Sequence, residues 1–282
     1  MIILKDFNPV NSYINQAKRA GLAIGFIPTM GALHKGHIAL IEQAREACGL
    51  VVCSIFVNPT QFNDAKDYQK YPVSLEQDIY QLEKAGANLL FLPSSDSLYP
   101  GGIGHLEQYE LGYLETVLEG AYRPGHFQGV CQVMSRLLNI VQPTLLFMGQ
   151  KDYQQCLVIK RLMQMLQLPA ELVSCPTIRE LDGLAMSSRN KRLGDMQRQR
   201  AIGIFRTLIF LKENIHKGNI EPLKKKAMTL LEEYNFKTDY IEIANADTLE
   251  LISDWNGQQK LVALIAAFQE EIRLIDNMLI AP

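Results

Sequence analysis

Short apolar runs alternate along the first part of the chain with segments whose apolar residues recur at helical spacing. These apolar runs are typical of strands that are buried on both faces of a parallel sheet, and the one over residues 50–57 is rich in β-branched residues. They cover residues 22–27, 50–57, 89–92, 145–148 and 171–174. Strands that alternate with helices predict right-handed βαβ units. We therefore expect an α/β fold with a Rossmann-like, doubly wound parallel sheet.

The carboxyl-terminal part of the chain follows another order, with helices first and strands afterwards. The expected helices cover residues 195–216 and 221–234, and the expected strands cover residues 239–244, 261–268 and 271–275. At 282 residues the chain is long enough for two domains. We predict a Rossmann-like domain over residues 1–176 and a smaller α+β domain over residues 177–282, with the boundary between Pro176 and Gly183.

A strand-to-helix turn over residues 28–37 joins the first predicted strand to a helix. The small residues Gly31, Ala32 and Gly36 let a ligand come close to the backbone of this turn. His34 and His37 lie three residues apart at the start of the helix, where free N–H groups and the helix dipole favour an anion. Imidazole donors would point at the same anion. The turn therefore predicts a phosphate-binding site.

Two other interpretations of the histidine pair stay open from the residues alone. A polar side chain at a helix start is also suited to capping the helix. A pair of histidines is also half of a metal site. The complete strand–turn–helix context favours phosphate over both alternatives.

Two more polar segments follow apolar strands and are expected at the same edge of the sheet. Residues 58–63 follow the second predicted strand, and residues 149–152 follow the fourth. In doubly wound sheets, ligands bind beyond the carboxyl ends of the strands. Lys151 is a cation at a helix start, where it opposes the helix dipole unless an anion is nearby. Asp152 and Gln155 alternatively form the cap of that helix.

Other local patterns lead to smaller predictions. Ser74 and Gln77 fit a capping box for the helix before the third predicted strand. Arg123 and His126 are either surface capping residues or part of a second substrate loop. Residues 93–119 follow no regular pattern, so no element is predicted there.

Composition argues against several classes of protein. A net charge of −2 does not suit a general nucleic-acid binder, which needs a basic surface. Five dispersed cysteines without a CxxC pair are typical of reduced thiols rather than a disulfide framework or a zinc site. No apolar run approaches the ~18 residues of a membrane-spanning helix. Lys5 and Asp6 carry charges too early for a signal peptide. We therefore expect a soluble cytoplasmic protein with no nucleic-acid or membrane partner.

These motifs together resemble one known family. Residues 28–37 resemble the HIGH motif of class I nucleotidyl-transferring folds, and Met186-Ser187-Ser188-Arg189 resembles the KMSKS element that pairs with it. The other matching segments are Ser54-Ile55-Phe56-Val57-Asn58-Pro59-Thr60-Gln61-Phe62, Tyr71-Pro72, Leu118-Glu119-Gly120, Arg123-Pro124-Gly125-His126-Phe127 and Lys151-Asp152. In order and spacing, over essentially the whole chain, the set is similar to the pantothenate synthetases, or pantoate–β-alanine ligases.

The resemblance implies a reaction in two steps. ATP and (R)-pantoate form an enzyme-bound pantoyl adenylate with release of diphosphate, and the amine of β-alanine then displaces AMP to give pantothenate. This is the last step of pantothenate biosynthesis. The resemblance also implies Mg²⁺ as a cofactor, a homodimer, and a C-terminal lid domain. No magnesium ligand is assigned, because phosphate oxygens and water usually supply most of them.

The resemblance further implies roles for particular residues. His37 is the implied proton donor, and His34 and Lys151 are implied catalytic residues that hold phosphate. Implied ATP contacts are Met30, Gly31, Ala32, Leu33, His34, Lys35, Gly36, His37, Gly149, Gln150, Lys151, Asp152, Ile178, Met186, Ser187, Ser188 and Arg189. Pantoate would lie between Gln61 and Gln155, whose amides both donate and accept hydrogen bonds. Gln61 would also contact β-alanine.

The sequence departs from the family pattern at two positions. Gln150 stands where the family usually has glutamate, and Thr60 stands where methionine is common. Gln150 has a mild effect if this position contacts ATP through its backbone. It lowers the affinity of the enzyme if the charge of the usual glutamate orients magnesium or lysine. The second change is expected mainly to reshape a pocket wall.

Two other functions compete with this interpretation. A related nucleotidyltransferase would share the histidine turn, but it has no need for Gln61 and Gln155 facing a carboxylate. A non-catalytic nucleotide-binding module would not need the intact set of His34, His37 and Lys151. An aminoacyl-tRNA synthetase is not expected, because the chain has neither an anticodon-binding extension nor a basic surface.

Overall fold

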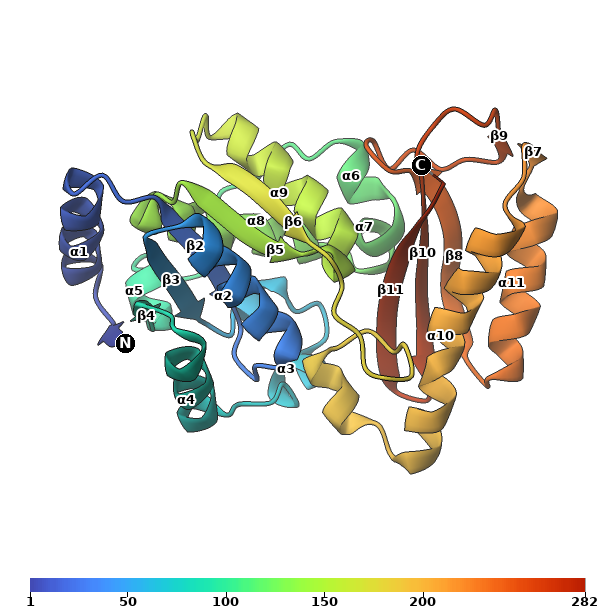
Figure 1. Ribbon diagram of the computed structural model, residues 1–282, viewed down its shortest axis with the longest axis horizontal. Helices are drawn as coiled ribbons and strands as arrows, with labels where there is room; N and C mark the ends of the chain where they lie inside the picture. The colour runs from blue at the N-terminus through green and yellow to red at the C-terminus, as the bar shows by residue number, and fades with distance from the viewer. Residues whose placement is uncertain (282) are drawn as a thin grey trace. The chain divides into compact units, whose positions relative to one another are not determined.

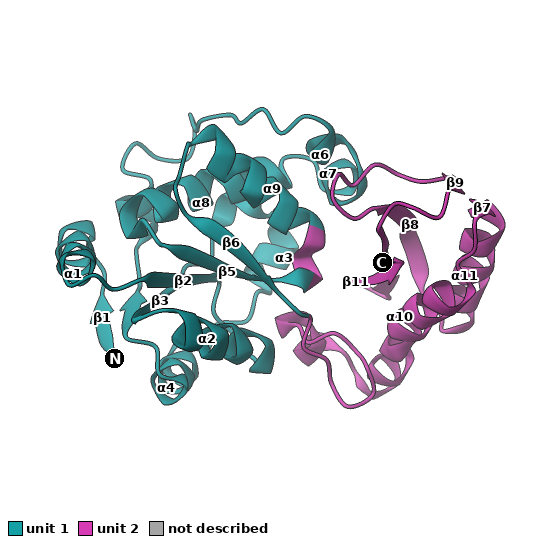
Figure 2. Cartoon of the chain, turned by 45° about the horizontal axis from the view of Figure 1, so that its top comes forward, with its two compact units in different colours: residues 1–150, 154–176 teal, residues 151–153, 177–282 magenta. Residues whose placement is uncertain are grey.

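The computed structural model describes residues 1–281, which form two compact units (Figure 2). The first unit contains residues 1–150 and 154–176. The second contains the residues from 177 onward together with residues 151–153. The first unit is built on a parallel sheet and the second on an antiparallel one, so the predicted fold class is confirmed.

The first unit has a six-stranded sheet in the order β1-β4-β3-β2-β5-β6, of which β2 to β6 are labelled in Figure 1. Its strands are β1 (Ile2–Leu4), β2 (Ile24–Thr29), β3 (Leu50–Ile55), β4 (Leu89–Phe91), β5 (Leu145–Gly149) and β6 (Glu171–Cys175). Every neighbouring pair is parallel. The order reverses between β2 and β5, and ligands of doubly wound sheets bind at the carboxyl ends of strands beside such a reversal.

Helices and short 3₁₀ turns connect these strands. The helices are α1 (Phe7–Arg19), α2 (Lys35–Ala47), α3 (Ala65–Gln69), α4 (Leu75–Ala85), α5 (Ser95–Leu98), α6 (Tyr113–Thr116), α7 (Leu118–Tyr122), α8 (His126–Val141) and α9 (Tyr153–Met165). The 3₁₀ turns are η1 (Pro59–Gln61) and η2 (Gln150–Asp152). Among residues 1–281, no helix is both long and apolar enough to cross a membrane.

Both faces of the parallel sheet are covered by helices. Ile24 and Phe26 of β2 pack with residues of α1, α8 and α9. Val51 and Cys53 of β3 pack with residues of α2 and α4 on the opposite face. Because successive side chains of a strand point to opposite faces, burial on both sides requires a continuous apolar run. This is the pattern by which the strands were predicted.

The second unit has a three-stranded antiparallel sheet in the order β11-β10-β8. Its elements are η3 (Ser188–Arg192), α10 (Asp195–Asn214), β7 (Gly218–Asn219), α11 (Glu221–Glu233), β8 (Lys237–Asn245), β9 (Asp254–Trp255), β10 (Leu261–Gln269) and β11 (Ile272–Ala281). Leu208 of α10 and Leu231 of α11 share a buried apolar cluster with Ile265 of β10. The helices therefore supply the core on which this sheet packs.

The structure differs from the expectations based on the sequence in several places. Ser74 is the N-cap residue of α4, but the capping box with Gln77 is absent: the Ser74 side chain makes no capping bond, and its Oγ donates to the carboxylate of Asp78 at 3.1 Å. Residues 93–119, for which no element was predicted, contain α5 and α6 and the first residues of α7. Strand β1, which was not predicted, pairs with β4. The last strand continues to Ala281, because β11 stays paired with β10 over its whole length.

Candidate active site

The histidine turn is closed by the two imidazoles themselves. His34 is the N-cap residue of α2, and its Nδ1 accepts a hydrogen bond from the Gly36 N–H at 3.1 Å. The His37 Nδ1 accepts from the His34 N–H at 3.3 Å, so the two residues form a reciprocal capping box. Their ring centroids lie 4.1 Å apart. The capping interpretation of these histidines is therefore correct.

Capping by Nδ1 also fixes what the rings offer to a ligand. A neutral imidazole that accepts at Nδ1 carries its hydrogen on Nε2. The capping bonds therefore make both Nε2 atoms donors without requiring a positive charge. The backbone N–H groups of His34 and Gly36 are already bonded to the imidazoles and are not available to an anion at this turn. Capping and phosphate binding are compatible roles for the same pair.

A buried carboxylate holds the backbone of the turn. Asp78 of α4 is 1% exposed and accepts hydrogen bonds from the N–H groups of Ala32 at 2.8 Å and Leu33 at 2.9 Å. Gly31 and Ala32 have φ values of +78° and +50°, so the turn adopts a left-handed conformation that needs support. Asp78 was not among the residues predicted from the sequence. Its signal was an acid at helical spacing with the buried Leu82 of α4.

The loop after β3 presents Gln61 in one orientation. The buried Asn58 donates from Nδ2 to the Gln61 Oε1 at 3.2 Å and to the Gly129 carbonyl at 3.0 Å. The Tyr99 hydroxyl donates to the Asn58 Oδ1 at 2.9 Å, and burial raises the pKa of this phenol. With its oxygen occupied, the Gln61 amide points Nε2 at the Met30 sulfur, 2.9 Å away. Gln61 is thereby set as a donor beside the histidine turn.

Gly129 lets this loop lie against α8. A Cβ at this position would meet the Thr60 carbonyl oxygen at 2.1 Å and the Gln61 Cα at 2.6 Å. Thr60 adds a hydrogen bond from its hydroxyl to the Gly129 carbonyl at 3.4 Å. Only glycine allows such a close approach of two backbones.

Replacing Gly129 with alanine should therefore displace the loop that carries Gln61. We expect the free energy of unfolding to fall by about 1–3 kcal/mol, and we expect KM to rise for the substrate that contacts Gln61. Urea unfolding and steady-state kinetics measure both effects. Gly104→Ala is the matched control, because a Cβ at Gly104 meets nothing within 4 Å. Equal effects of the two variants would contradict the prediction.

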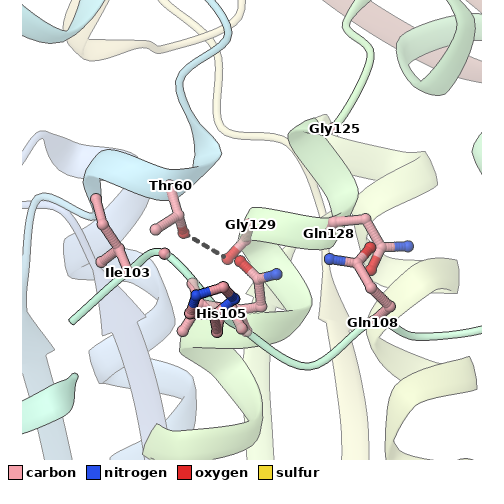
Figure 3. A pocket seen from close by; sticks show the side chains of 10 residues that line it. Thr60, Ile103, His105, Gln108, Gly125, Gln128 and Gly129 are labelled. Carbon is pink, nitrogen blue, oxygen red and sulfur yellow. Dashed lines mark hydrogen bonds between the residues drawn. The ribbon is translucent and has the colours of Figure 1, made fainter. Parts of the chain in front are cut away.

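A pocket lies beside the same loop, with the Thr60–Gly129 hydrogen bond in its wall (Figure 3). It is lined by Thr60, Ile103, Gly104, His105, Leu106, Gln108, Gly125, Gln128, Gly129 and Gln132. None of the catalytic or substrate-binding residues expected from the sequence lines this pocket. Thr60 lines this pocket, but the wall that Thr60 was expected to reshape is that of the substrate site, so that expectation stays a prediction.

Arg123 is the C-cap residue of α7, but neither Arg123 nor His126 is an exposed surface residue. His126 is buried, and its Nδ1 lies 2.8 Å from the Gln61 carbonyl oxygen, to which it donates. Its Nε2 is then the acceptor for Arg123 Nη1 at 3.0 Å. Arg123 also bonds the buried Glu119 at 3.4 Å. The three side chains form a chain of contacts that ends on the backbone of the Gln61 loop.

Two adjacent glutamines of α9 differ in their surroundings. Gln154 is buried, accepts from the Glu119 N–H at 3.0 Å and donates to the carbonyls of Leu114 and Val117. Its amide therefore serves to hold the loop before α7. Gln155 lies next to it and is only partly buried. Of the two amides, Gln155 is the better candidate for a ligand contact.

The Lys151 ammonium has an anion nearby within its own turn. Lys151 Nζ lies 3.8 Å from the Asp152 carboxylate. Both residues lie in the 3₁₀ turn η2, directly before α9. Asp152 therefore offsets part of the unfavourable interaction between Lys151 and the helix dipole. The Asp152 side chain is 50% exposed, so this pair is weakened by solvent.

The connection after β6 is a short hairpin. The Met186 N–H donates to the Ile178 carbonyl at 3.0 Å, and Arg179 pairs with Ala185 in an antiparallel bridge. The hairpin places two expected ATP contacts side by side. Ser187 then caps η3 by accepting the Arg189 N–H at 3.3 Å.

The structure thus assembles the expected residues in two groups. In the first unit, the histidine turn, Met30 and Gln61 lie together. In the second unit, the hairpin joins Ile178 and Met186.

A family model described as pantoate-beta-alanine ligase matches residues 2–279 of this chain. The chain belongs to the pantoate-beta-alanine ligase family. The resemblance of its motifs to that family is therefore confirmed. Membership also identifies the protein as an enzyme, an acid–amine ligase that joins pantoate and β-alanine. Neither the nucleotidyltransferase nor the non-catalytic module is supported.

Individual relatives agree with this assignment. The pantothenate synthetase of Cytophaga hutchinsonii is 41% identical over 283 residues, covering 99% of each chain. The crystal structure of pantothenate synthetase from Thermus thermophilus matches with a TM-score of 0.88 and 39% identity over 100% of both chains. Another match is the crystal structure of pantoate-beta-alanine ligase from Francisella tularensis, complexed with beta-gamma ATP and beta-alanine. It has a TM-score of 0.83 and 37% identity, covering 99% of this chain and 97% of that one.

Proposed function

We propose that this ligase forms pantoyl adenylate from ATP and pantoate and then transfers the pantoyl group to β-alanine. In the first step a pantoate carboxylate oxygen attacks the α-phosphorus of ATP, and diphosphate leaves. In the second step the β-alanine nitrogen attacks the acyl carbon, the carbon–oxygen bond to AMP breaks, and the nitrogen loses a proton. The observation that carries the proposal is the capped histidine pair, which presents two imidazole donors at the start of α2.

The first step brings two anions together, and charge grows on the leaving diphosphate. Fixed donors and cations at that point lower the barrier more than mobile water does. We assign His37 as the proton donor and His34 as a second phosphate contact. Lys151 would supply a compact positive charge, and Ser187, Ser188 and Arg189 would bind the leaving diphosphate.

ATP would lie along the turn over residues 30–37 and the segment over residues 149–152. The adenine would contact the backbone of Ile178, next to Met186, and Asp152 would bond the ribose hydroxyls. The hydrogen bond between Ile178 and Met186 supports a shared binding role for this hairpin. The beta-gamma ATP named for the Francisella tularensis relative supports ATP as the co-substrate.

Pantoate would be held by Gln61 and Gln155, and β-alanine by Gln61. The bond from Asn58 to Gln61 supports a donor role for the Gln61 Nε2 toward a carboxylate or hydroxyl oxygen. The partly buried position of Gln155 supports its assignment over Gln154.

Magnesium would enter with ATP. Within residues 1–281, no group of three or more His, Cys, Asp or Glu side chains is arranged to hold a metal ion. Mg²⁺ commonly binds substrate phosphates and water with only one or two carboxylates, so a nucleotide-bound ion needs no such cluster of protein ligands. When bound, Mg²⁺ would neutralise phosphate charge, while the histidines and Lys151 orient the phosphates.

The two compact units would divide these tasks. We infer that residues 1–176 bind nucleotide and pantoate and that residues 177–282 act as a lid, as the sequence analysis expected. We also infer a homodimer in the cytoplasm. All five cysteines are free thiols, which supports a reducing compartment. Light scattering of the purified protein would measure the oligomeric state.

Replacing Gln150 with glutamate, the usual family residue, should leave turnover within about threefold of the original enzyme. The reason is that a backbone contact to ATP does not depend on the side-chain charge. Steady-state kinetics with pantoate, β-alanine and magnesium-ATP measures the effect. A gain of about a hundredfold would contradict the backbone role of this position.

Diphosphate release from magnesium-ATP tests the proposed function. Release equal to the amount of enzyme with pantoate alone, becoming continuous when β-alanine is added, would support the two-step ligation. Diphosphate release that depends on neither pantoate nor β-alanine would indicate a nucleotidyltransferase. ATP binding without any release would indicate a non-catalytic module.

A further inference from the structure

The carbonyl of Lys151 is held by a residue from the end of the chain. Asn277 of β11 donates from Nδ2 to the Lys151 carbonyl oxygen at 2.7 Å. Two residues later, the Tyr153 hydroxyl donates to the Ala246 carbonyl at 2.7 Å. These two bonds explain why residues 151–153 group with the second unit, although β5 and most of α9 lie in the first. The lysine is thus anchored on the antiparallel sheet.

The neighbouring residue of β11 anchors the Ile178–Met186 hairpin. Asp276 is 4% exposed and accepts two bonds from the Arg179 guanidinium, at 2.6 and 3.1 Å. Arg179 also donates to the carbonyls of Gly183 at 3.0 Å and Asn277 at 3.3 Å, and its guanidinium lies 4.8 Å from the centre of the Phe205 ring. These contacts together fix the arginine in one position.

Asp276 and Asn277 connect two segments that are far apart in sequence. Successive side chains of a strand leave it on opposite faces, so one dipeptide can hold two partners at once. The Asn277 N–H also donates to the Asp276 Oδ1 at 2.8 Å, which couples the two residues. A shift of β11 at this point would move Lys151 and the hairpin together.

We propose that Asp276 and Asn277 are positioning residues for adenylate formation. They set the Lys151 ammonium against the hairpin that carries Ile178 and Met186, and neither residue touches the substrate. This inference rests on the proposed phosphate role of Lys151. A purely structural role for the pair would affect both steps of the reaction equally, whereas positioning of Lys151 affects only the step that involves ATP.

The two steps are separable by experiment. Pantoate-dependent exchange of labelled diphosphate into ATP reports the first step, and the reaction of synthetic pantoyl adenylate with β-alanine reports the second. For Asn277→Ala we expect the exchange rate to fall by about 10- to 100-fold, since small misplacements of a catalytic group cost this much. The second step should stay within about threefold of wild type.

Further variants separate the hydrogen bond from side-chain packing. Asn277→Asp keeps the side-chain size but removes the N–H donor, so its exchange rate should fall at least as far as that of Asn277→Ala. Asn219→Ala is the matched control, because the Asn219 amide oxygen accepts from the nearby Glu221 N–H, at 2.9 Å, within the same unit. Its exchange rate should match wild type. Thermal unfolding of each variant reports its stability.

Results that differ from these expectations can be assigned to one cause. Equal losses in both steps, or a wild-type exchange rate in Asn277→Asp, would overturn the positioning role. Lys151→Met distinguishes this failure from a failure of the proposed function. If Lys151→Met abolishes exchange while the Asn277 variants do not, only the positioning role is wrong. If Lys151→Met leaves exchange intact, the proposed role of Lys151 is wrong, and with it the inference.

Discussion

Replacing His37 with alanine should lower the rate of diphosphate release in the first step by about 10²–10⁴-fold, the range typical of a lost general acid. The substitution removes an imidazole whose Nδ1 is bound to the His34 N–H, and with it the Nε2 donor that would face phosphate. A rapid-quench measurement with magnesium-ATP and pantoate gives this rate directly. Nucleotide affinity should change much less, because the other proposed phosphate contacts remain.

Loss of a helix cap alone does not account for such an effect. The capping bond of His37 contributes about 0.5–2 kcal/mol to stability, which thermal unfolding would detect. Ser94→Ala is the matched control, since the Ser94 hydroxyl caps α5 by accepting the Ser97 N–H at 3.1 Å. That variant should lose stability without losing rate. A rate for His37→Ala within about tenfold of wild type would contradict its role as proton donor.

Replacing Asp276 with asparagine should lower the free energy of unfolding by about 3–5 kcal/mol, because it leaves the Arg179 guanidinium without its carboxylate. Asp276 and Arg179 have side chains that are 3% and 19% exposed, so solvent replaces little of the lost interaction. Burial raises the pKa of the Asp276 carboxyl above its ordinary value, and the bonds from Arg179 offset only part of this increase. Urea unfolding at neutral pH measures the difference in the free energy of unfolding, provided that the dependence of this energy on urea concentration is the same for both proteins.

A double substitution tests the cause of this loss. Removing both partners, as in Asp276→Asn combined with Arg179→Met, leaves no unpaired buried charge at this pair and should restore part of the stability. Arg198→Met is the control, because the Arg198–Asp182 pair has side chains that are 34% and 37% exposed and contributes little. If Asp276→Asn and Arg198→Met cost the same, the buried pair has no special role in stability.

Much of the fold could be predicted because its signals are local. Strands buried on both faces, such as β3, require continuous apolar runs, and amphipathic helices such as α1 repeat their buried residues at helical spacing. The strand–turn–helix around His34 was predicted for the same reason. Strand β1 was missed because three residues carry no pattern; its partner β4 decides its conformation.

The candidate site was predictable only where its residues lie in the turns themselves. The histidine pair and Lys151 stand at helix starts, where their chemistry can be recognised from neighbours in sequence. Asp78 reaches the turn from 46 residues away, and Gln154 reaches Glu119 from 35 residues away. No spacing rule in the sequence links such pairs. The capping box predicted at Ser74 shows the same limit. The Ser74 hydroxyl, which was expected to cap the helix start, instead donates to the Asp78 carboxylate.

By itself, the sequence determined which segments form strands and helices, which turns lie at the carboxyl ends of the strands, and which family motifs the chain carries. These properties depend on interactions over a few residues. Only the tertiary structure decided that Asp78 supports the histidine turn, that Asn58 and Tyr99 orient Gln61, and that Asn277 holds Lys151 from 126 residues away. Each of these bonds joins groups that meet only after the sheets and helices have packed. Their partners are therefore set by the geometry of the whole fold.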